Sequence, residues 1–276
     1  MRVGQPGKPE VARFVLAGRP RPRVEDTLRI AEVARLAAMS KFRGDRPPIE
    51  LTGRGDDGPL RDDPSHAHAF YLPEDADHDG LIDHLLIYCR LGFSDPARRA
   101  LDGLTALWLE HGRADEEGER GRKEWRVALE DIASPAVFAG SSRLLKQTRV
   151  WESVTPYLKN RFDKRRPKSF SAMVETYSEQ IITEWKRRFP DIPALNVEPM
   201  LDHANPSRFV APVGPGRALR STLAFARTRA GRGGRQPDTS GGFFRLVLDN
   251  EVEGPVALGW GAHFGLGLFA GVDSRE

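Results

Sequence analysis

The 276-residue sequence has a single cysteine, Cys89, and no apolar run as long as a membrane span. One cysteine excludes an internal disulfide and a zinc site built from several thiolates. The first ten residues, MRVGQPGKPE, lack the hydrophobic stretch of a signal peptide. We therefore expect a cytoplasmic protein without a membrane segment, in which Cys89 is a small buried residue of the run LIDHLLIYC.

Acidic residues are missing from one segment of an otherwise ordinary globular composition. The chain is 39% hydrophobic and 29% charged, with a formal net charge of +3. The stretch from Arg217 to Arg235 holds several arginines and no acid, and a second basic cluster, KNRFDKRRPK, occupies residues 159–168. A solvated loop has such a composition, but so does a segment that binds a polyphosphate backbone.

The apolar patterns of the first half predict the order strand, helix, strand, strand, helix, strand. The strands are apolar runs next to turn residues, and the first helix has apolar residues at helical spacing. A Ser or Asp N-cap and a proline in the first turn mark the second helix. This order is that of a ferredoxin-like unit. The segments are residues 11–18, 24–42, 66–73, 81–89, 94–112 and 124–132.

The second half repeats this alternation. Residues 143–158 are predicted to be extended, residues 170–189 to form an amphipathic helix, and residues 243–250 and 254–272 to form two or three strands, with a long basic loop before them. We therefore predict an α+β fold of two tandem ferredoxin-like (RRM-like) units. The expected units are residues 1–124 and residues 125–276, the second with the basic loop and a C-terminal glycine-rich loop.

The glycine-rich loop, GWGAHFGLGLFAG, occupies residues 259–271 and contains one histidine, His263. A Rossmann fingerprint needs a following helix, a further strand and an acid about 20 residues on, and too little chain remains after Gly267. A P-loop needs a Gly-Lys-Ser/Thr that is absent. Two interpretations remain: a loop whose backbone approaches a ligand closely, and a hairpin tip with an exposed histidine.

Two histidines, His66 and His68, lie two positions apart in SHAHAF, and so on one face if the segment is a strand. Such a pair is typical of a metal site, a general acid–base site or a polar patch. His84 on the next strand would complete a three-histidine zinc site if the hairpin register allows it. No carboxylate or thiol at ligand spacing accompanies these histidines, which argues against a metal.

An acidic turn, EDADHDG, copies the beginning of a calcium-binding loop at Asp75, Asp77, Asp79 and Gly80. The twelfth position of such a loop requires a bidentate glutamate, and here it is Leu86. A tight acidic turn therefore explains the sequence better than a calcium site does.

Aromatic and basic residues alternate in VWESVTPYLKNRF, residues 150–162. Trp151 and Tyr157 next to Lys159 and Arg161 suit the stacking and phosphate contacts of single-stranded or looped RNA. The two aromatic residues are equally compatible with a place in the core.

Three segments in this order, SHAHAFYLPEDADHDGLIDHLLIY, VWESVTPYLKNR and GWGAHFGLGLF, resemble the repeat-processing endoribonuclease half of a CRISPR-associated protein of type I-U (I-G) systems, the Csb-two family. In that family a Cas-five-like part is fused to a Cas-six-like part. The resemblance runs from about residue 10 to the end of the chain. This sequence lacks the N-terminal half of the fused form, so it is a stand-alone nuclease or an excised domain.

The resemblance implies an enzyme that cuts CRISPR precursor RNA without a metal or other cofactor, through attack of the 2′-hydroxyl. It also implies binding to the processed RNA together with Cas-five-like, Cas-seven-like and Cas-eight-like effector subunits. Histidine can serve as base or acid in this chemistry, and His263 stands where many relatives have a basic residue. The candidate catalytic residues are His68 or His66 as the base, with His263 as the rival base or as the acid. The candidate RNA-binding residues are Gly259, Gly261, Gly265, Gly267, Arg149, Lys159, Arg161, Arg165, Arg166, Arg217 and Arg220.

Two other functions fit the same residues. The tandem fold can serve as a non-catalytic subunit that only binds repeat RNA. Alternatively, His66, His68 and His84 can hold the metal of a hydrolase.

Overall fold

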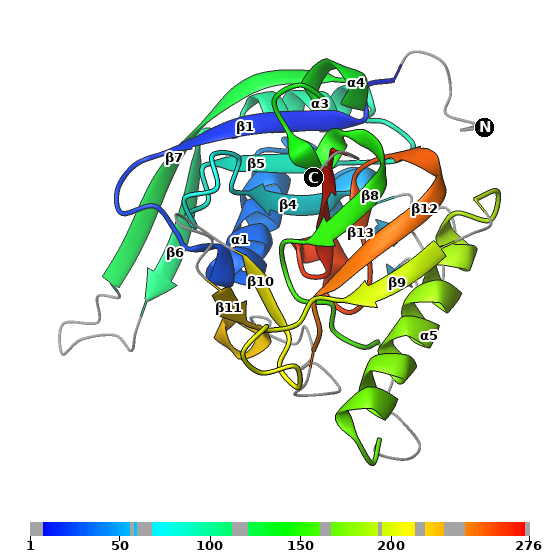
Figure 1. Cartoon of the computed structure of the whole chain (residues 1–276). Helices are drawn as coiled ribbons and strands as arrows, with labels where there is room; N and C mark the ends of the chain where they lie inside the picture. The colour runs from blue at the N-terminus through cyan, green and yellow to red at the C-terminus, as the bar shows by residue number, and fades with distance from the viewer. Residues whose placement is uncertain are drawn as a thin grey trace.

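The computed structural model describes most of the chain as two antiparallel sheets with helices packed against them (Figure 1). None of the described helices is long and apolar enough to cross a membrane. The described residues are 8–55, 58–59, 68–111, 121–160, 167–192, 195–212, 219–228 and 241–273.

The first sheet has the strand order β4-β5-β1-β7-β6, and every neighbouring pair is antiparallel. The four strands β4-β5-β1-β7 reproduce the order of a ferredoxin-like unit, and β6 is an additional edge strand. The bounds are β1 Val11–Ala17, β4 Phe70–Glu74, β5 His84–Tyr88, β6 Ala106–His111 and β7 Gly121–Ala133. The expected hairpin of β4 and β5 is therefore present.

Helix α1, Thr27–Ser40, packs on one face of the first sheet and is preceded by a 3-10 turn, η1 Val24–Asp26. Its buried side includes Ile30, Ala34 and Ala38, which are four residues apart, as one face of a helix requires. Shorter elements follow it along the chain. They are α2 Ile49–Thr52, β2 Arg54–Gly55 and β3 Gly58–Pro59.

The predicted helix over residues 94–112 is only partly correct. Helix α3 spans Asp95–Asp102, with the Ser94 hydroxyl accepting a hydrogen bond from the Ala97 amide at 3.4 Å. Gly103 then ends the helix, and residues 106–111 pair with β7 as strand β6. Backbone pairing with β7 determines this segment, whereas local helix propensity suggested the opposite.

The second sheet has the order β13-β14-β8-β12-β9, so β14-β8-β12-β9 repeats the ferredoxin-like order. Helix α5, Phe170–Arg188, connects β8 to β9 and lies on the outer side of this sheet in Figure 1. The strand bounds are β8 Gln147–Ser153, β9 Leu195–Pro199, β12 Phe244–Glu253, β13 Val256–Ala257 and β14 Leu268–Val272. The fold is therefore α+β with two ferredoxin-like sheets, as predicted.

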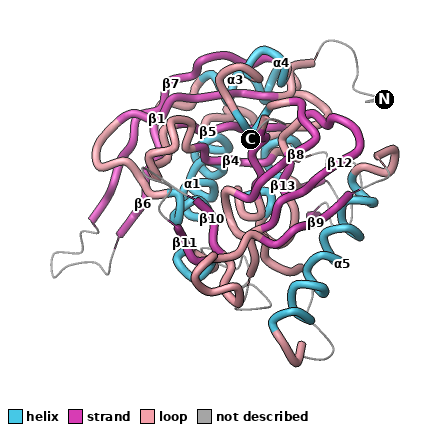
Figure 2. The backbone as a smooth tube through the Cα atoms, in the orientation of Figure 1, coloured by secondary structure: helices cyan, strands magenta, loops and turns pink. Residues whose placement is uncertain are grey.

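The second unit has no helix between β12 and β14, where the first unit has α3. This segment contains β13 and a single 3-10 turn, η5 Ala262–Phe264, within the glycine-rich loop. Figure 2 shows α5 as the long helix among the described residues of this half. The loop therefore occupies the position of the second helix of a ferredoxin-like unit.

The remaining short elements connect or flank the two sheets. The connection holds α4 Pro135–Phe138 and η2 Arg143–Leu145, and the insertion before β12 holds β10 Val210–Pro212, β11 Leu219–Ser221 and η4 Thr222–Ala224. The expected unit boundary at residues 124/125 lies inside β7. The change from the first sheet to the second occurs between β7 and β8.

The two units pack together through the face of the first sheet that is turned away from α1. A cluster of buried residues joins Leu72 of β4 and Leu86 of β5 to Leu268 and Ala270 of β14. The glycine-rich loop lies at the β4 edge of the first sheet, where η5 contacts both β4 and α1. Residues of both units therefore meet at this loop.

Candidate active site

The glycines of the C-terminal loop are required by the packing of the chain on itself. All four have positive φ, between 57° at Gly267 and 88° at Gly259, which side chains rarely tolerate. A Cβ at Gly267 would lie 1.7 Å from the Leu258 carbonyl oxygen, and one at Gly259 would lie 2.5 Å from the Leu158 carbonyl oxygen. The loop therefore has one compact conformation that only glycine permits.

Hydrogen bonds fix this loop to the segment that follows β8. The Trp260 amide donates to the Leu158 carbonyl at 2.7 Å, and the Gly267 amide donates to the Pro156 carbonyl at 2.9 Å. The buried Thr155 hydroxyl donates to the Gly265 carbonyl at 2.7 Å and accepts from the Leu268 amide at 2.9 Å. With its backbone groups paired in this way, the loop is a rigid support for the side chain at its tip.

That side chain is His263, which lies between two aromatic rings of the first unit. Its ring centroid is 3.8 Å from Phe70, with planes 23° apart, and 3.9 Å from His68, with planes 17° apart. Two rings at these distances cannot share one face of an imidazole, so His263 is sandwiched between them. His68 and His263 are both partly exposed. The fold thus assembles two histidines that lie 195 residues apart in sequence.

The hydrogen bond at His263 indicates the tautomer of its neutral ring. Nδ1 lies 3.3 Å from the Ala69 carbonyl oxygen. Because a carbonyl only accepts hydrogen bonds, Nδ1 carries the hydrogen, and in the neutral ring Nε2 is left as the acceptor.

Stacking also restricts the charge that the two histidines can carry together. Two unit charges about 4 Å apart repel by about 4 kcal/mol at the effective dielectric of a protein surface. The arrangement therefore disfavours simultaneous protonation of the two imidazoles.

A guanidinium and a carboxylate from the end of α5 border this stack. Arg188 lies over the Phe70 ring at 6.0 Å, pairs with Glu184 at 2.6 Å and donates to the Ala257 carbonyl. Glu184 also accepts the Gly259 amide, at 2.9 Å. Burial lowers the pKa of Arg188, and the Glu184 carboxylate opposes that shift. Glu184 therefore connects the long helix, the glycine-rich loop and the arginine.

The structure separates the other predicted site residues. Arg149 is exposed on β8, whereas Lys159 is only 2% exposed, with its ammonium 5.1 Å from the Tyr177 ring centroid. Arg220 pairs with Glu25 at 3.1 Å. Lys159 as placed cannot contact a backbone phosphate at the surface, and Arg220 is already neutralised. Five predicted residues lie outside the described part of the chain: His66, Arg161, Arg165, Arg166 and Arg217.

His84 does not join His68. The hairpin register pairs His84 with Glu74 at one end of β4, whereas His68 precedes Phe70 at the other end. The His84 ring instead lies 2.8 Å from Asp83 and 3.8 Å from Glu130. The register therefore does not build the three-histidine site considered from the sequence.

One acidic group in the described residues has the spacing of metal ligands, namely Asp75, Asp77 and Asp83. Backbone amides of Asp79 and Gly80 donate to Asp75, as in a tight acidic turn. Leu86, the twelfth position of the calcium pattern, is fully buried in β5.

Sequence reasoning missed Phe70, Glu184 and Arg188 as part of this site. The i, i+4 spacing of Glu184 and Arg188 indicates an ion pair on a helix, but nothing in the sequence places that pair beside β4. Phe70 belongs to SHAHAF, where only the histidines drew attention.

No protein-family model matches the chain, and no curated protein matches its sequence. The chain is similar to a solved structure described as "Cas6 (TTHB231) product complex", with 16% sequence identity and a TM-score of 0.38, over 96% of this chain and 100% of the other. The ferredoxin-like assignment of the two units therefore rests on their own strand orders.

Proposed function

We propose that this protein is a metal-independent endoribonuclease that cleaves CRISPR precursor RNA within its repeats. The observation that supports this proposal most directly is the stacked pair His68–His263, which is built from both units and partly open to solvent. The family resemblance of the three sequence segments supplies the substrate. In this proposal the protein stays bound to the processed RNA, next to Cas-five-like, Cas-seven-like and Cas-eight-like subunits in the cytoplasm.

The proposed reaction is an internal transesterification. Nε2 of His263 takes the proton of a ribose 2′-hydroxyl, whose oxygen attacks the adjacent phosphorus. The bond from phosphorus to the 5′-oxygen breaks, and protonated His68 gives its proton to that oxygen. The products are a 2′,3′-cyclic phosphate and a 5′-hydroxyl, so no water and no oxidant are consumed.

A guanidinium near the histidines supports this chemistry. Arg188 lies at the Phe70 ring with its charge paired to Glu184, and its N–H groups can donate hydrogen bonds to the phosphorane oxygens. Exposed Arg149 on β8 and the basic segments at residues 159–168 and 217–235 suit the RNA backbone. A polyanion is thus the substrate class that the charge pattern favours.

The test is cleavage of a labelled repeat RNA, from the genome that encodes the chain, in excess EDTA. We expect the wild type to cut at one position, and a 2′-deoxy substitution at that nucleotide to abolish cutting. His263→Ala and His68→Ala should each lower the single-turnover rate about 10²- to 10⁴-fold. His203→Ala is the matched control, because His203 is exposed. Cutting that requires a metal, or that survives both variants, would contradict the proposal.

A non-catalytic RNA-binding subunit is the second candidate. It is favoured by the sandwich itself, because Phe70 and His68 cover both faces of His263 and would serve equally well to lock the two units together. Tight binding of repeat RNA by the wild type, without any cutting, would establish this alternative.

A further inference from the structure

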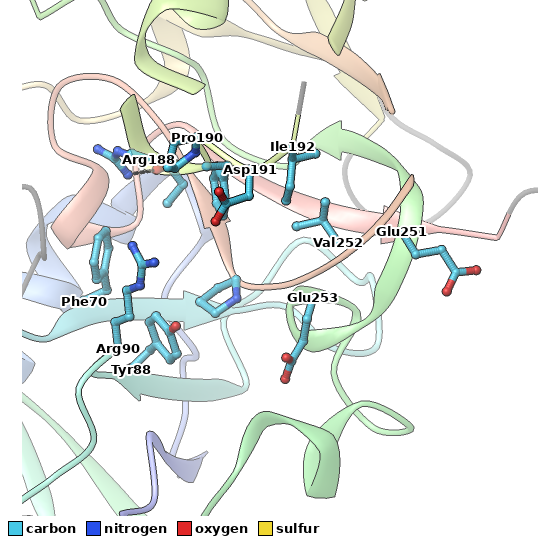
Figure 3. A pocket seen from close by; sticks show the side chains of 13 residues that line it. Phe70, Tyr88, Arg90, Arg188, Pro190, Asp191, Ile192, Glu251, Val252 and Glu253 are labelled. Carbon is cyan, nitrogen blue, oxygen red and sulfur yellow. Dashed lines mark hydrogen bonds between the residues drawn. The ribbon is translucent and has the colours of Figure 1, made fainter. Parts of the chain in front are cut away.

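A cavity of about 210 Å³ lies where the two units meet (Figure 3). Three segments form it. They are β4 with the end of β5, the residues 188–192 that end α5, and the residues 251–257 that join β12 to β13. Because both units contribute walls, the cavity exists only when the units are docked.

The walls of the cavity are largely aromatic and aliphatic. Phe70 and Tyr88 come from the first unit, and Phe189, Ile192 and Val252 come from the second. Drug-sized pockets usually measure about 300–1,000 Å³. This smaller cavity therefore suits one flat ring system, such as a nucleobase, better than a larger ligand.

Arginines stand on one side of the cavity. Arg90 and Arg188 come from different units, and Figure 3 shows the Arg90 guanidinium beside the Phe70 ring. Arg188 is paired with Glu184, whereas Arg90 forms no hydrogen bond or ion pair with any residue that the structure describes. A guanidinium in this position is available for an anion or for stacking on a ring.

Carboxylates line the cavity as well, at Asp191, Glu251 and Glu253. Three acids disfavour a ligand with several phosphate charges, such as a nucleoside triphosphate. They do accept hydrogen bonds from a base edge that offers donors. Guanine presents two adjacent donors, N1–H and the N2 amino group, and a carboxylate can accept both. Adenine, cytosine and uracil each place an acceptor next to their donor.

Phe70 connects the cavity to the histidines. One face of its ring stacks on His263 at 3.8 Å, and the side chain also lines the cavity. Looped RNA commonly displays unstacked bases to aromatic rings, arginine planes and hydrogen-bonding groups. We propose that the cavity binds one unstacked guanine of the RNA, close to the cleaved phosphodiester, with Arg90 on its phosphate.

This inference rests on the proposed function, since the occupant belongs to the RNA substrate. Its test is therefore a binding measurement that does not depend on cleavage. The probe is the repeat RNA with a 2′-deoxy nucleotide at the cut, in which each guanine near the cut is replaced in turn by an abasic nucleotide, by inosine or by adenine. Dissociation constants are measured for the wild type, for Arg90→Ala and for Asp191→Asn.

We expect one position at which the abasic replacement weakens wild-type binding roughly 10- to 100-fold. Inosine at that position should weaken binding less, because it removes only the N2 amino group. In Arg90→Ala the abasic replacement should weaken binding much less than it does in the wild type, because the base and the arginine belong to the same binding site. Arg98→Gln, an exposed arginine on α3, is the matched control and should bind every RNA as the wild type does.

Two results would overturn the inference. One is equal binding of all the abasic RNAs by a wild type that still binds the repeat. The other is binding of guanosine monophosphate alone to the cavity, blocked by Arg90→Ala, without any position effect in RNA, which would indicate a site for a free nucleotide. An enzyme that never cuts, but shows the coupling of Arg90 with one guanine, would refute the proposed catalysis and leave this inference standing.

Discussion

The two units share a strand order but differ in what connects their last two core strands. In the first unit α3 follows β5, and its Ala97, Ala100 and Leu101 are buried. In the second unit the glycine-rich loop follows β12. A helix with side chains is about 10 Å across, whereas glycine backbone can touch its neighbour directly: a Cβ at Gly265 would lie 3.0 Å from Pro73 and from Thr27 of the first unit.

This difference explains why the candidate site is at the loop. Replacing a helix by a thin loop lets the second unit bring a side chain, His263, onto the first strand of the β4–β5 hairpin. The first unit then contributes His68 and Phe70. The presence of a loop where the first unit has a helix is therefore the feature that brings residues of both units into one site.

The interiors of the two units differ too. The first unit buries charge: Arg13 and Glu74 are each 3% exposed and pair at 3.2 Å, and Glu130 pairs with the same arginine at 2.5 Å. The second unit instead buries aromatic rings, with Tyr157, Tyr177 and Phe244 in mutual edge contact, and its buried Lys159 lies against the Tyr177 ring. Substitutions should thus act through different mechanisms in the two halves.

The largest effect is expected for Gly267→Ala, which tests whether the loop needs glycine. A Cβ 1.7 Å from a carbonyl oxygen, at a φ of 57°, forces the backbone to move. We expect the free energy of unfolding to fall by more than about 4 kcal/mol, or the second unit not to fold. Chemical denaturation measures this change. Gly140→Ala is the control, because no atom lies within 4 Å of its Cβ position, and equal stability of the two variants would contradict the prediction.

A somewhat smaller loss is expected for Arg13→Met, which tests the charged interior of the first unit. Removal of the arginine leaves the buried Glu74 carboxylate without its cation, and such a change costs about 3 kcal/mol. The pKa of Glu74 is already raised by burial, so the carboxyl should become protonated in the variant. The double variant Arg13→Met, Glu74→Leu should recover much of the loss in urea unfolding. If the single and the double variant are equally unstable, loss of the ion pair is not the cause of the lower stability.

Much of this architecture follows from sequence patterns because local signals and tertiary structure agree there. Apolar spacing predicts α1 and α5, and the acidic turn predicts the hairpin of β4 and β5. Residues 106–111 were mispredicted because their pairing with β7 is a long-range contact. The candidate site is harder still. Histidines 195 positions apart meet only through the docking of two units, and the Arg188 side chain is positioned by a carbonyl and a carboxylate from separate segments.

A moderate effect is expected for Glu184→Gln, which tests the connection between α5 and the loop. Glutamine can still accept the Gly259 amide but loses the charge that pairs with Arg188. We expect a loss of about 1–2 kcal/mol in the free energy of unfolding, with slower cleavage because the loop that carries His263 is less rigid. Glu179→Gln, an exposed residue of the same helix, is the control. Unchanged stability and cleavage rate in Glu184→Gln would show that the charge of Glu184 contributes neither to folding nor to the position of the loop.

A dependence of stability on pH is expected for the first unit alone. Burial, with nearby Asp79 and Asp83, raises the pKa of Asp75 from its ordinary value near 4 to about 7. Between about pH 4 and 7 the folded protein therefore holds a proton that the unfolded chain has released, so this group makes the free energy of unfolding fall as pH rises through that window. Asp75→Asn keeps an oxygen that can accept the Gly80 amide and removes the titration. Urea unfolding at several pH values should show that the free energy of unfolding depends less on pH in Asp75→Asn than in the wild type. Asp249→Asn, at an exposed residue of β12 in the second unit, is the control and should show the same pH dependence as the wild type. The same pH dependence in all three proteins would mean that Asp75 titrates like a solvated carboxyl. The buried ionisable groups that distinguish the first unit would then be limited to Arg13 and Glu74.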